Sequence, residues 1–191
     1  MRSKYLTNVT DFTKLINKDI IKEGCVVIDA TVGNGYDTQY LAEKVGNTGK
    51  VYGFDIQKEA IENTKKRLEK EKLFNNVTLI LDGHENMDKY INEKVDSIFF
   101  NLGYLPKLDH NIKTKADTTI EALKKSLNLL KKNGILSICI YLGHDGGIEE
   151  KEAIEDLLFN LEQKKFDVLK CSFKNQKNNP PQLILVEKKF D

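Results

Sequence analysis

Apolar residues along the chain fall into two alternating patterns, continuous runs and helical spacings. The continuous runs occupy residues 25–31, 50–56, 77–83, 95–103 and 135–143. Between them, apolar residues recur every three or four positions, which is typical of helices with one buried face. These spacings predict helices at residues 12–20, 37–45, 57–72, 87–91, 117–130 and 154–161. Strands that alternate with helices predict a parallel sheet covered on both faces, because parallel strands need crossover connections.

The end of the chain departs from this alternation. Two strand-like runs, residues 166–175 and 182–189, are separated only by a polar loop that contains Pro180 and Pro181. A loop this short joins antiparallel neighbours but cannot make a parallel crossover. The sequence therefore predicts an α/β, Rossmann-like fold, a mostly parallel seven-stranded sheet with a reversed last strand and helices on both faces.

Length and charge set wide limits on the function. A chain of 191 residues can bury a core on both sides of one sheet, so we expect a single domain over residues 1–191. The 30 Lys and Arg residues nearly balance the 29 Asp and Glu residues, which gives a formal net charge of +1. This balance neither favours nor excludes a nucleic-acid partner, because an acidic face can offset a basic one.

The sequence favours a cytoplasmic protein with no membrane contact. Its apolar runs are far shorter than the roughly 20 residues that span a bilayer, and its first residues lack the apolar centre of a secretory signal. Cys25, Cys139 and Cys171 are odd in number, far apart and within strand-like runs. We expect them to be buried thiols in a reducing compartment, and no metal site is visible in the sequence.

Two loops next to strands carry the first candidate chemistry. Gly33 and Gly35 follow the first strand, and Asp55 ends the second. In an open parallel sheet, ligands bind outside the carboxyl ends of the strands. Glycines let the backbone approach a ligand closely, and a carboxylate can accept hydrogen bonds from both hydroxyls of a ribose. These loops therefore predict a site for a cofactor that contains adenosine.

Two classes of cofactor compete for this site. A dinucleotide site would favour a third small residue where Thr38 stands, and its pyrophosphate would be repelled by Asp37 at the start of the helix. S-adenosylmethionine carries no phosphate, and acidic residues such as Asp29 and Asp37 could attract its ammonium group. The pattern, together with the reversed last strand, favours S-adenosylmethionine.

Further candidates follow the third, fourth and fifth strands. Gly83 and His84 end the third strand, where His84 could contact an adenine or could simply be a surface residue. Asn101 and Tyr104 leave the fourth strand in "NLGYLP". Asn101 could orient an amine or could instead cap the strand end, and Tyr104 could stack on a base. His144, after the fifth strand, could relay a proton or could be an ordinary loop residue.

Several motifs together resemble one family. The segments "DATVGNGYDT", "VYGFDIQ", "FNLGYLP", "TKADTTIEAL", "YLGHDGG" and "NQKNNPP" occur in this order. In order and spacing they resemble the small bacterial proteins labelled ribosomal RNA methylases, a family associated with tRNA 5-(aminomethyl)-2-thiouridine methyltransferase activity. The resemblance extends from about residue 10 to residue 189. "NLGYLP" is also similar to the Asn-Pro-Pro-Tyr loop of methyltransferases that act on exocyclic amines, with Leu102 and Gly103 in place of the prolines.

This resemblance implies a class I methyltransferase that uses S-adenosyl-L-methionine and releases S-adenosylhomocysteine (SAH). The acceptor would be the amine of 5-aminomethyl-2-thiouridine at the wobble position of tRNA, and the enzyme would contact the anticodon region as a homodimer. A methyltransferase that acts on rRNA or on a small-molecule amine is the alternative. The residues implied in donor binding are Asn34, Tyr36, Asp55, Gln57, Gly83 and His84. Thr31, Gly33, Gly35, Asp37 and Ile56 lie in the same loops and complete the expected donor site.

Lysines near the expected acceptor pocket suggest where RNA would bind. The long connection at residues 107–119 carries Lys107, Lys113 and Lys115, and Lys174 and Lys177 lie near the last loop. Such lysines suit phosphate contacts, which position RNA without reading its sequence. In a lysine-rich protein they could equally be ordinary solvated side chains.

Overall fold

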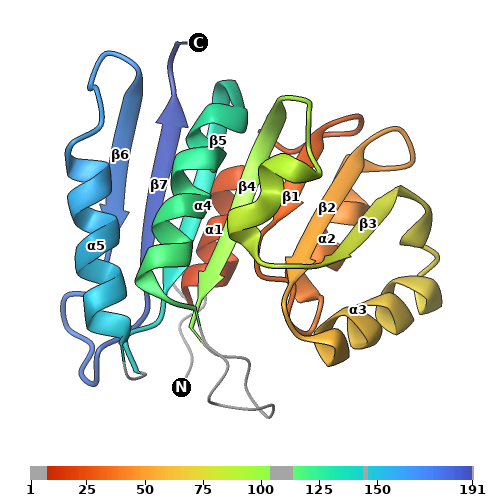
Figure 1. Cartoon of the computed structure of the whole chain (residues 1–191), viewed down its shortest axis with the longest axis horizontal. Coiled ribbons are helices and arrows are strands. Elements are labelled where there is room, and N and C mark those ends of the chain that lie inside the picture. Colours follow the sequence, from red (N-terminus) through yellow and green to blue (C-terminus); the bar gives the residue numbers. More distant parts are fainter. Residues whose placement is uncertain (1–7, 104–113, 144–145, 191) are drawn as a thin grey trace.

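The computed structural model describes residues 8–103, 114–143 and 146–190, which share one seven-stranded sheet (Figure 1). The strands are β1 (Val26–Asp29), β2 (Lys50–Asp55), β3 (Val77–Leu81), β4 (Val95–Leu102), β5 (Leu130–Ile140), β6 (Phe166–Cys171) and β7 (Gln182–Lys188). Their order across the sheet is β3-β2-β1-β4-β5-β7-β6. The strand order reverses at β1, which lies between β2 and β4. The loops after β1 and β4 therefore meet at the carboxyl ends of the strands, where such sheets bind ligands.

The predicted reversed strand is confirmed. Strands β3, β2, β1, β4 and β5 pair in parallel, whereas β7 pairs antiparallel with both β5 and β6. The last strand of the chain is therefore inserted between β5 and β6, and β6 forms the edge of the sheet. Because β6 runs parallel to β5, the loop from β6 to β7 lies on the side of the sheet formed by the carboxyl ends of the parallel strands. The loops after β1 and β4 lie on the same side.

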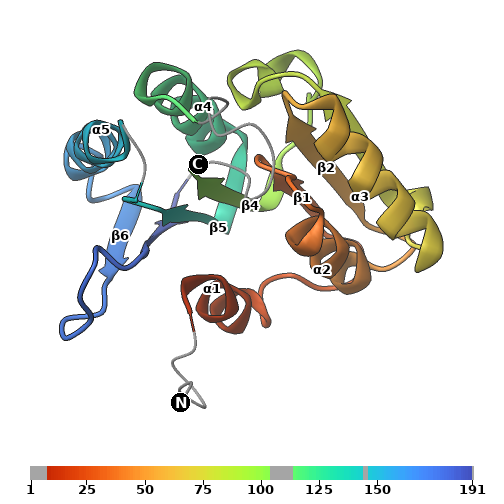
Figure 2. The same ribbon diagram turned by 90° about the horizontal axis from the view of Figure 1, so that it is seen from below.

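Helices cover both faces of the sheet, as the sequence predicts. Figure 2 shows α1 (Val9–Asn17) and α2 (Tyr36–Val45) on one side and α4 (Ala116–Leu129) and α5 (Gly147–Phe159) on the other. The remaining helical segments are α3 (Lys58–Lys70) and the 3₁₀ turns η1 (Phe74–Asn76) and η2 (His84–Lys89).

The core consists of a separate apolar cluster on each face. Consecutive residues of β4 point to opposite faces, so Phe99 packs with α2 and α3 while Phe100 packs with α4 and α5. A third, smaller cluster joins Val9 of α1 to Cys139 of β5 and to β7. This cluster fixes α1 beneath the neighbouring strands.

Three local predictions differ from the structure. The helix expected at residues 87–91 is the 3₁₀ turn η2, which begins at His84. Strand β5 begins at Leu130 rather than residue 135, because Leu130 is fully buried and pairs with Val95 despite the polar residues that follow it. The helix expected at residues 117–130 is α4, which begins one residue earlier at Ala116, so Asp117 lies in its first turn.

No helix among the described residues is both long and apolar enough to cross a membrane.

Candidate cofactor and acceptor site

The loop from β1 to α2 is tied to both neighbouring strands. The Ala30 amide donates to the Phe99 carbonyl at 2.8 Å, and the Val32 amide donates to the Phe54 carbonyl at 3.0 Å. These bonds continue the sheet past its formal end and hold the loop between β2 and β4. The loop is therefore preorganised by backbone contacts.

Gly35 is required by the conformation of this loop. It precedes α2 with φ +76°, and a Cβ at this position would lie 2.5 Å from Thr64 Oγ1 of α3. Any other residue would meet both a left-handed backbone and a collision. The Thr64 hydroxyl in turn donates to the Gly33 carbonyl at 3.1 Å, so α3 packs directly on the turn.

Asp55 connects this loop to the end of β2. One carboxylate oxygen accepts from the Gly33 amide at 2.8 Å and the other accepts from the Gln57 amide at 2.9 Å. Burial raises the pKa of Asp55, while these backbone donors act in the opposite direction. A carboxylate has about four acceptor positions, so acceptor capacity remains for a hydroxyl group of a ligand.

Arg67 of α3 holds the outer side of the same loop. Its Nε donates to the Asn34 carbonyl at 2.9 Å, and its guanidinium lies 4.0 Å from the centre of the Tyr36 ring. Tyr36 is 63% exposed at the rim. Nothing in the sequence marks Arg67 or Thr64 as site residues, because both stand in a regular helical pattern that gives no sign of what their side chains contact.

Asp29 is the most deeply buried carboxyl group of the site. It accepts hydrogen bonds from the Thr38 hydroxyl at 2.6 Å and from the Thr31 amide at 3.2 Å. Burial, and then repulsion by Asp37, raises its pKa to about 7, although both hydrogen bonds favour the ionised form. Asp29 therefore links the loop to α2, because Thr31 belongs to the loop and Thr38 to the helix.

His84 is buried and does not behave as a surface residue. Its ring packs edge-on against Phe100 with centroids 5.4 Å apart, and its Nδ1 lies 3.2 Å from the Ala30 carbonyl. Burial lowers its pKa, so the neutral ring is favoured. A carbonyl can only accept, which places the proton on Nδ1 and leaves Nε2 as an acceptor. Among the described residues, Nε2 has no hydrogen-bond partner.

Asn101 stands at the end of β4 with its carboxamide held in one orientation. Its backbone amide donates to the Thr31 hydroxyl at 2.7 Å, and its Nδ2 donates to Asp37 Oδ2 at 2.7 Å. Asp37 Oδ1 is also paired with Lys14 Nζ of α1 at 2.7 Å. The Asn101 Oδ1 atom is buried and finds no partner within the described part of the chain.

The structure brings most of the sequence-predicted site residues to one edge of the sheet. Those at the carboxyl ends of β1, β2, β3 and β4, or in the segments that directly follow these strands, are Thr31, Gly33, Asn34, Gly35, Tyr36, Asp37, Asp55, Ile56, Gln57, Gly83, His84 and Asn101. Ile56 is 58% exposed there, as an apolar surface beside Asp55. Tyr104 and His144 lie outside the described residues.

Comparison with known proteins identifies related sequences. A family model described as "Putative rRNA methylase" matches residues 51–187. A chloroplastic tRNA (mnm(5)s(2)U34)-methyltransferase of Arabidopsis thaliana is 41% identical over 162 residues, which cover 76% of this chain and 57% of that protein. The chain thus spans little more than half the length of this curated relative.

Solved structures match the fold over nearly the whole chain. A "putative rRNA-methylase" from Clostridium thermocellum is 50% identical with a TM-score of 0.93, over 95% of this chain and 97% of that one. A "putative methyltransferase" from Streptococcus mutans in complex with SAH is 37% identical with a TM-score of 0.87, over 95% and 98% of the two chains. With the strand order above, these matches confirm the class I methyltransferase fold.

Proposed function

Because the chain belongs to the family described as "Putative rRNA methylase", we propose that it is a methyltransferase that uses S-adenosyl-L-methionine. Its acceptor is the primary amine of 5-aminomethyl-2-thiouridine at the wobble position of tRNA. The observation that carries this proposal is the convergence, at one edge of the sheet, of the Asp55 loop and the unpaired Asn101 Oδ1.

The polar groups at the ends of β2 and β3 suit S-adenosylmethionine as the donor. Gly33 and Gly35, both with positive φ, shape the loop beside Asp55, whose free acceptor positions suit ribose hydroxyls. The buried His84 Nε2 is an acceptor that suits an amino group, such as that of adenine. The further residues that we propose for the donor site are Thr31, Asn34, Tyr36, Asp37, Ile56, Gln57 and Gly83. Bound S-adenosylmethionine supplies a methyl group already activated by its sulfonium, and SAH is the product.

The substrate assignment draws on the Arabidopsis thaliana relative, whose name specifies uridine 34 of tRNA. The corresponding reaction needs an amine with a free lone pair. The aliphatic amine of Lys has a pKa of about 10.4. Burial and the positive sulfonium of the donor both lower the pKa of such an amine. The site therefore favours the reactive form of the amine without a strong base.

Asn101 is the group that we propose to orient this amine. Its Oδ1 can accept one N–H of the acceptor, so that the lone pair faces the donor. Correct alignment is the main contribution required of the protein, because the methyl group is already activated. Tyr104 and His144 remain proposed as a stacking surface for the base and a proton acceptor.

We further propose a cytoplasmic, single-domain protomer that forms a homodimer and binds the anticodon region of tRNA. The three cysteines are free thiols, which fits a reducing compartment. A homodimer is supported by apolar side chains around the edge strand β6, where Phe159 is 89% exposed and Leu169 is 58% exposed. Light scattering after size-exclusion chromatography tests the homodimer. Leu169→Glu should yield monomers. A wild-type protein that is monomeric would contradict the proposed homodimer.

The substrate class can be tested with S-adenosylmethionine that carries a labelled methyl group. Purified protein is offered tRNA, rRNA or a set of small amines, and incorporation into each is measured. We expect incorporation into tRNA that lacks wobble methylation and little into tRNA that already carries it. Incorporation into rRNA or into small amines alone would refute the assignment.

A further inference from the structure

We propose that Lys14 of α1 is a positioning residue for methyl transfer, acting through Asp37 to hold the Asn101 carboxamide with its oxygen toward the acceptor amine. This inference rests on the proposed function and adds residues from the first helix. Lys14, Asp37 and Asn101 come from α1, α2 and β4, yet they form one chain of contacts at 2.7 Å each.

The contact with Asp37 decides which end of the Asn101 carboxamide faces the site. A carboxylate can only accept hydrogen bonds, so the amide nitrogen must face Asp37 Oδ2 and the oxygen must point away. If the carboxamide were rotated by half a turn, Asn101 Oδ1 would face Asp37 Oδ2, and two acceptors would meet. A buried acceptor without a partner lowers the stability of the fold, which makes Oδ1 a group kept for a ligand.

Lys14 supplies the counter-charge that keeps Asp37 in this position. Asp29 is buried nearby and repels Asp37 when ionised. The Lys14–Asp37 pair is largely shielded, with side chains 27% and 13% exposed, so it is screened less than a surface pair. Without the ammonium group, Asp37 would be free to turn toward solvent and release Asn101.

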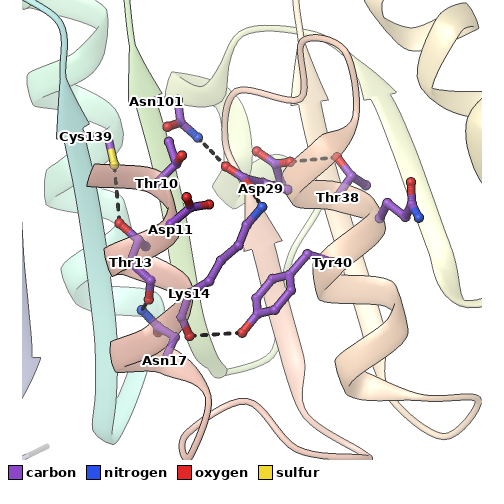
Figure 3. Close-up of polar contacts among 12 residues, drawn as sticks. Thr10, Asp11, Thr13, Lys14, Asn17, Asp29, Thr38, Tyr40, Asn101 and Cys139 are labelled. Carbon is purple, nitrogen blue, oxygen red and sulfur yellow. Dashed lines mark hydrogen bonds and ion pairs between the residues drawn. The ribbon is translucent and has the colours of Figure 1, made fainter. Parts of the chain in front are cut away.

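Tyr40 holds the Lys14 side chain over α2. Its hydroxyl donates to the Lys14 carbonyl at 3.1 Å, and Lys14 Nζ lies 5.2 Å from the centre of the ring (Figure 3). Lys44 Nζ lies 5.9 Å from the same ring. Lys44 thus shares the aromatic contact of Lys14, which makes it a matched control.

The register of α1 is fixed by buried polar contacts with the sheet. Asn17 is fully buried, donating to the Ser137 hydroxyl and accepting from the Ser97 hydroxyl, both at 2.9 Å. One turn earlier, the Thr13 hydroxyl lies 3.4 Å from Cys139 Sγ (Figure 3). A helix held at two successive turns presents Lys14 at one height above the sheet, as a positioning role requires.

The test compares Lys14→Met, Lys14→Arg, Lys44→Met, Asp37→Asn and the double variant Lys14→Met with Asp37→Asn. For each, kcat and KM for tRNA are measured, together with calorimetric affinity for SAH and the melting temperature. Lys14→Met should lower kcat roughly tenfold or more while SAH affinity and melting temperature stay near wild type. Lys14→Arg should restore most of the rate, and Lys44→Met should behave as wild type.

The double variant separates positioning from general stabilisation. If Lys14 acts through Asp37, adding Lys14→Met to Asp37→Asn should cause little further loss of kcat. The proposal is overturned if the two losses multiply, if Lys14→Met keeps the full rate, or if it mainly weakens SAH binding. A wild-type enzyme that transfers no methyl group to tRNA would instead refute the proposed function itself.

Discussion

The ionisation of Asp29 is changed more by the fold than that of the other acidic residues around the site. Complete burial and the neighbouring charge of Asp37 raise its pKa to about 7. In the unfolded chain the group ionises near its ordinary pKa of about 3.9. Between these two values the folded protein holds a proton that the unfolded chain releases.

This difference predicts how stability depends on pH. The protonated form of Asp29 favours the folded state, so its contribution to the free energy of unfolding falls as pH rises from about 4 to about 7 and then levels off. Asp29→Asn has no such proton. Relative to wild type, the variant should therefore gain stability as pH rises from about 4 to about 7 in thermal or urea unfolding. A difference that is constant with pH would contradict the raised pKa.

At the scale of elements, the loop from β1 to α2 and helix α3 form one unit. The helix contributes Thr64 and Arg67, which bind the carbonyls of Gly33 and Asn34. The loop in turn gives α3 a surface without side chains at Gly35. Changes at this contact should therefore affect both stability and donor binding.

Gly35→Ala tests this unit against a matched glycine. Gly146 has a similar backbone, with φ +83°, but a Cβ there would meet no atom of the described residues within 4 Å. Gly146→Ala should cost only the left-handed conformation, about 1–2 kcal/mol. Gly35→Ala adds the collision with Thr64, so it should cost more in denaturant unfolding and also weaken binding of SAH. Equal losses from both substitutions would show that the contact with α3 is not tight.

The sequence predicts the order of strands and helices because their apolar patterns are strong. The short connection after β6 also predicts the reversed strand correctly. Leu130 was misassigned because the polar residues after it hide a strand that gains its stability from pairing with Val95. Local patterns do not report such distant pairing.

For the same reason, only part of the site can be predicted from the sequence. Gly33, Gly35 and Asp55 stand next to strand ends, where chain position alone predicts a binding loop. Lys14 and Arg67 lie on ordinary helices, and their importance comes from contacts with Asp37 and Asn34 across the fold. Contacts between distant segments require the three-dimensional arrangement.

At the scale of the whole molecule, an RNA substrate predicts a strong effect of salt. Lys115, Lys174 and Lys177 are exposed at the edge of the sheet where the donor loops converge. If they contact phosphates, KM for tRNA should rise steeply with salt while SAH affinity changes little. Replacing Lys174 and Lys177 by Gln should flatten this dependence. Lys94→Gln, at the opposite edge, should not, and a salt-independent KM would favour a small substrate.

Identifying the methylated nucleoside separates the proposed tRNA activity from its alternatives. Isotope-labelled S-adenosylmethionine is incubated with the protein and tRNA from cells that lack wobble-uridine methylation, and the digested nucleosides are analysed by mass spectrometry. Asp55→Ala removes the carboxylate that joins Gly33 to Gln57, whereas Glu93→Gln changes a carboxylate bonded to Lys50 at the opposite edge of the sheet. We predict label in 5-methylaminomethyl-2-thiouridine with wild type and Glu93→Gln, and none with Asp55→Ala. If a wild-type protein that binds SAH yields no labelled nucleoside, the proposed methylation of tRNA is wrong.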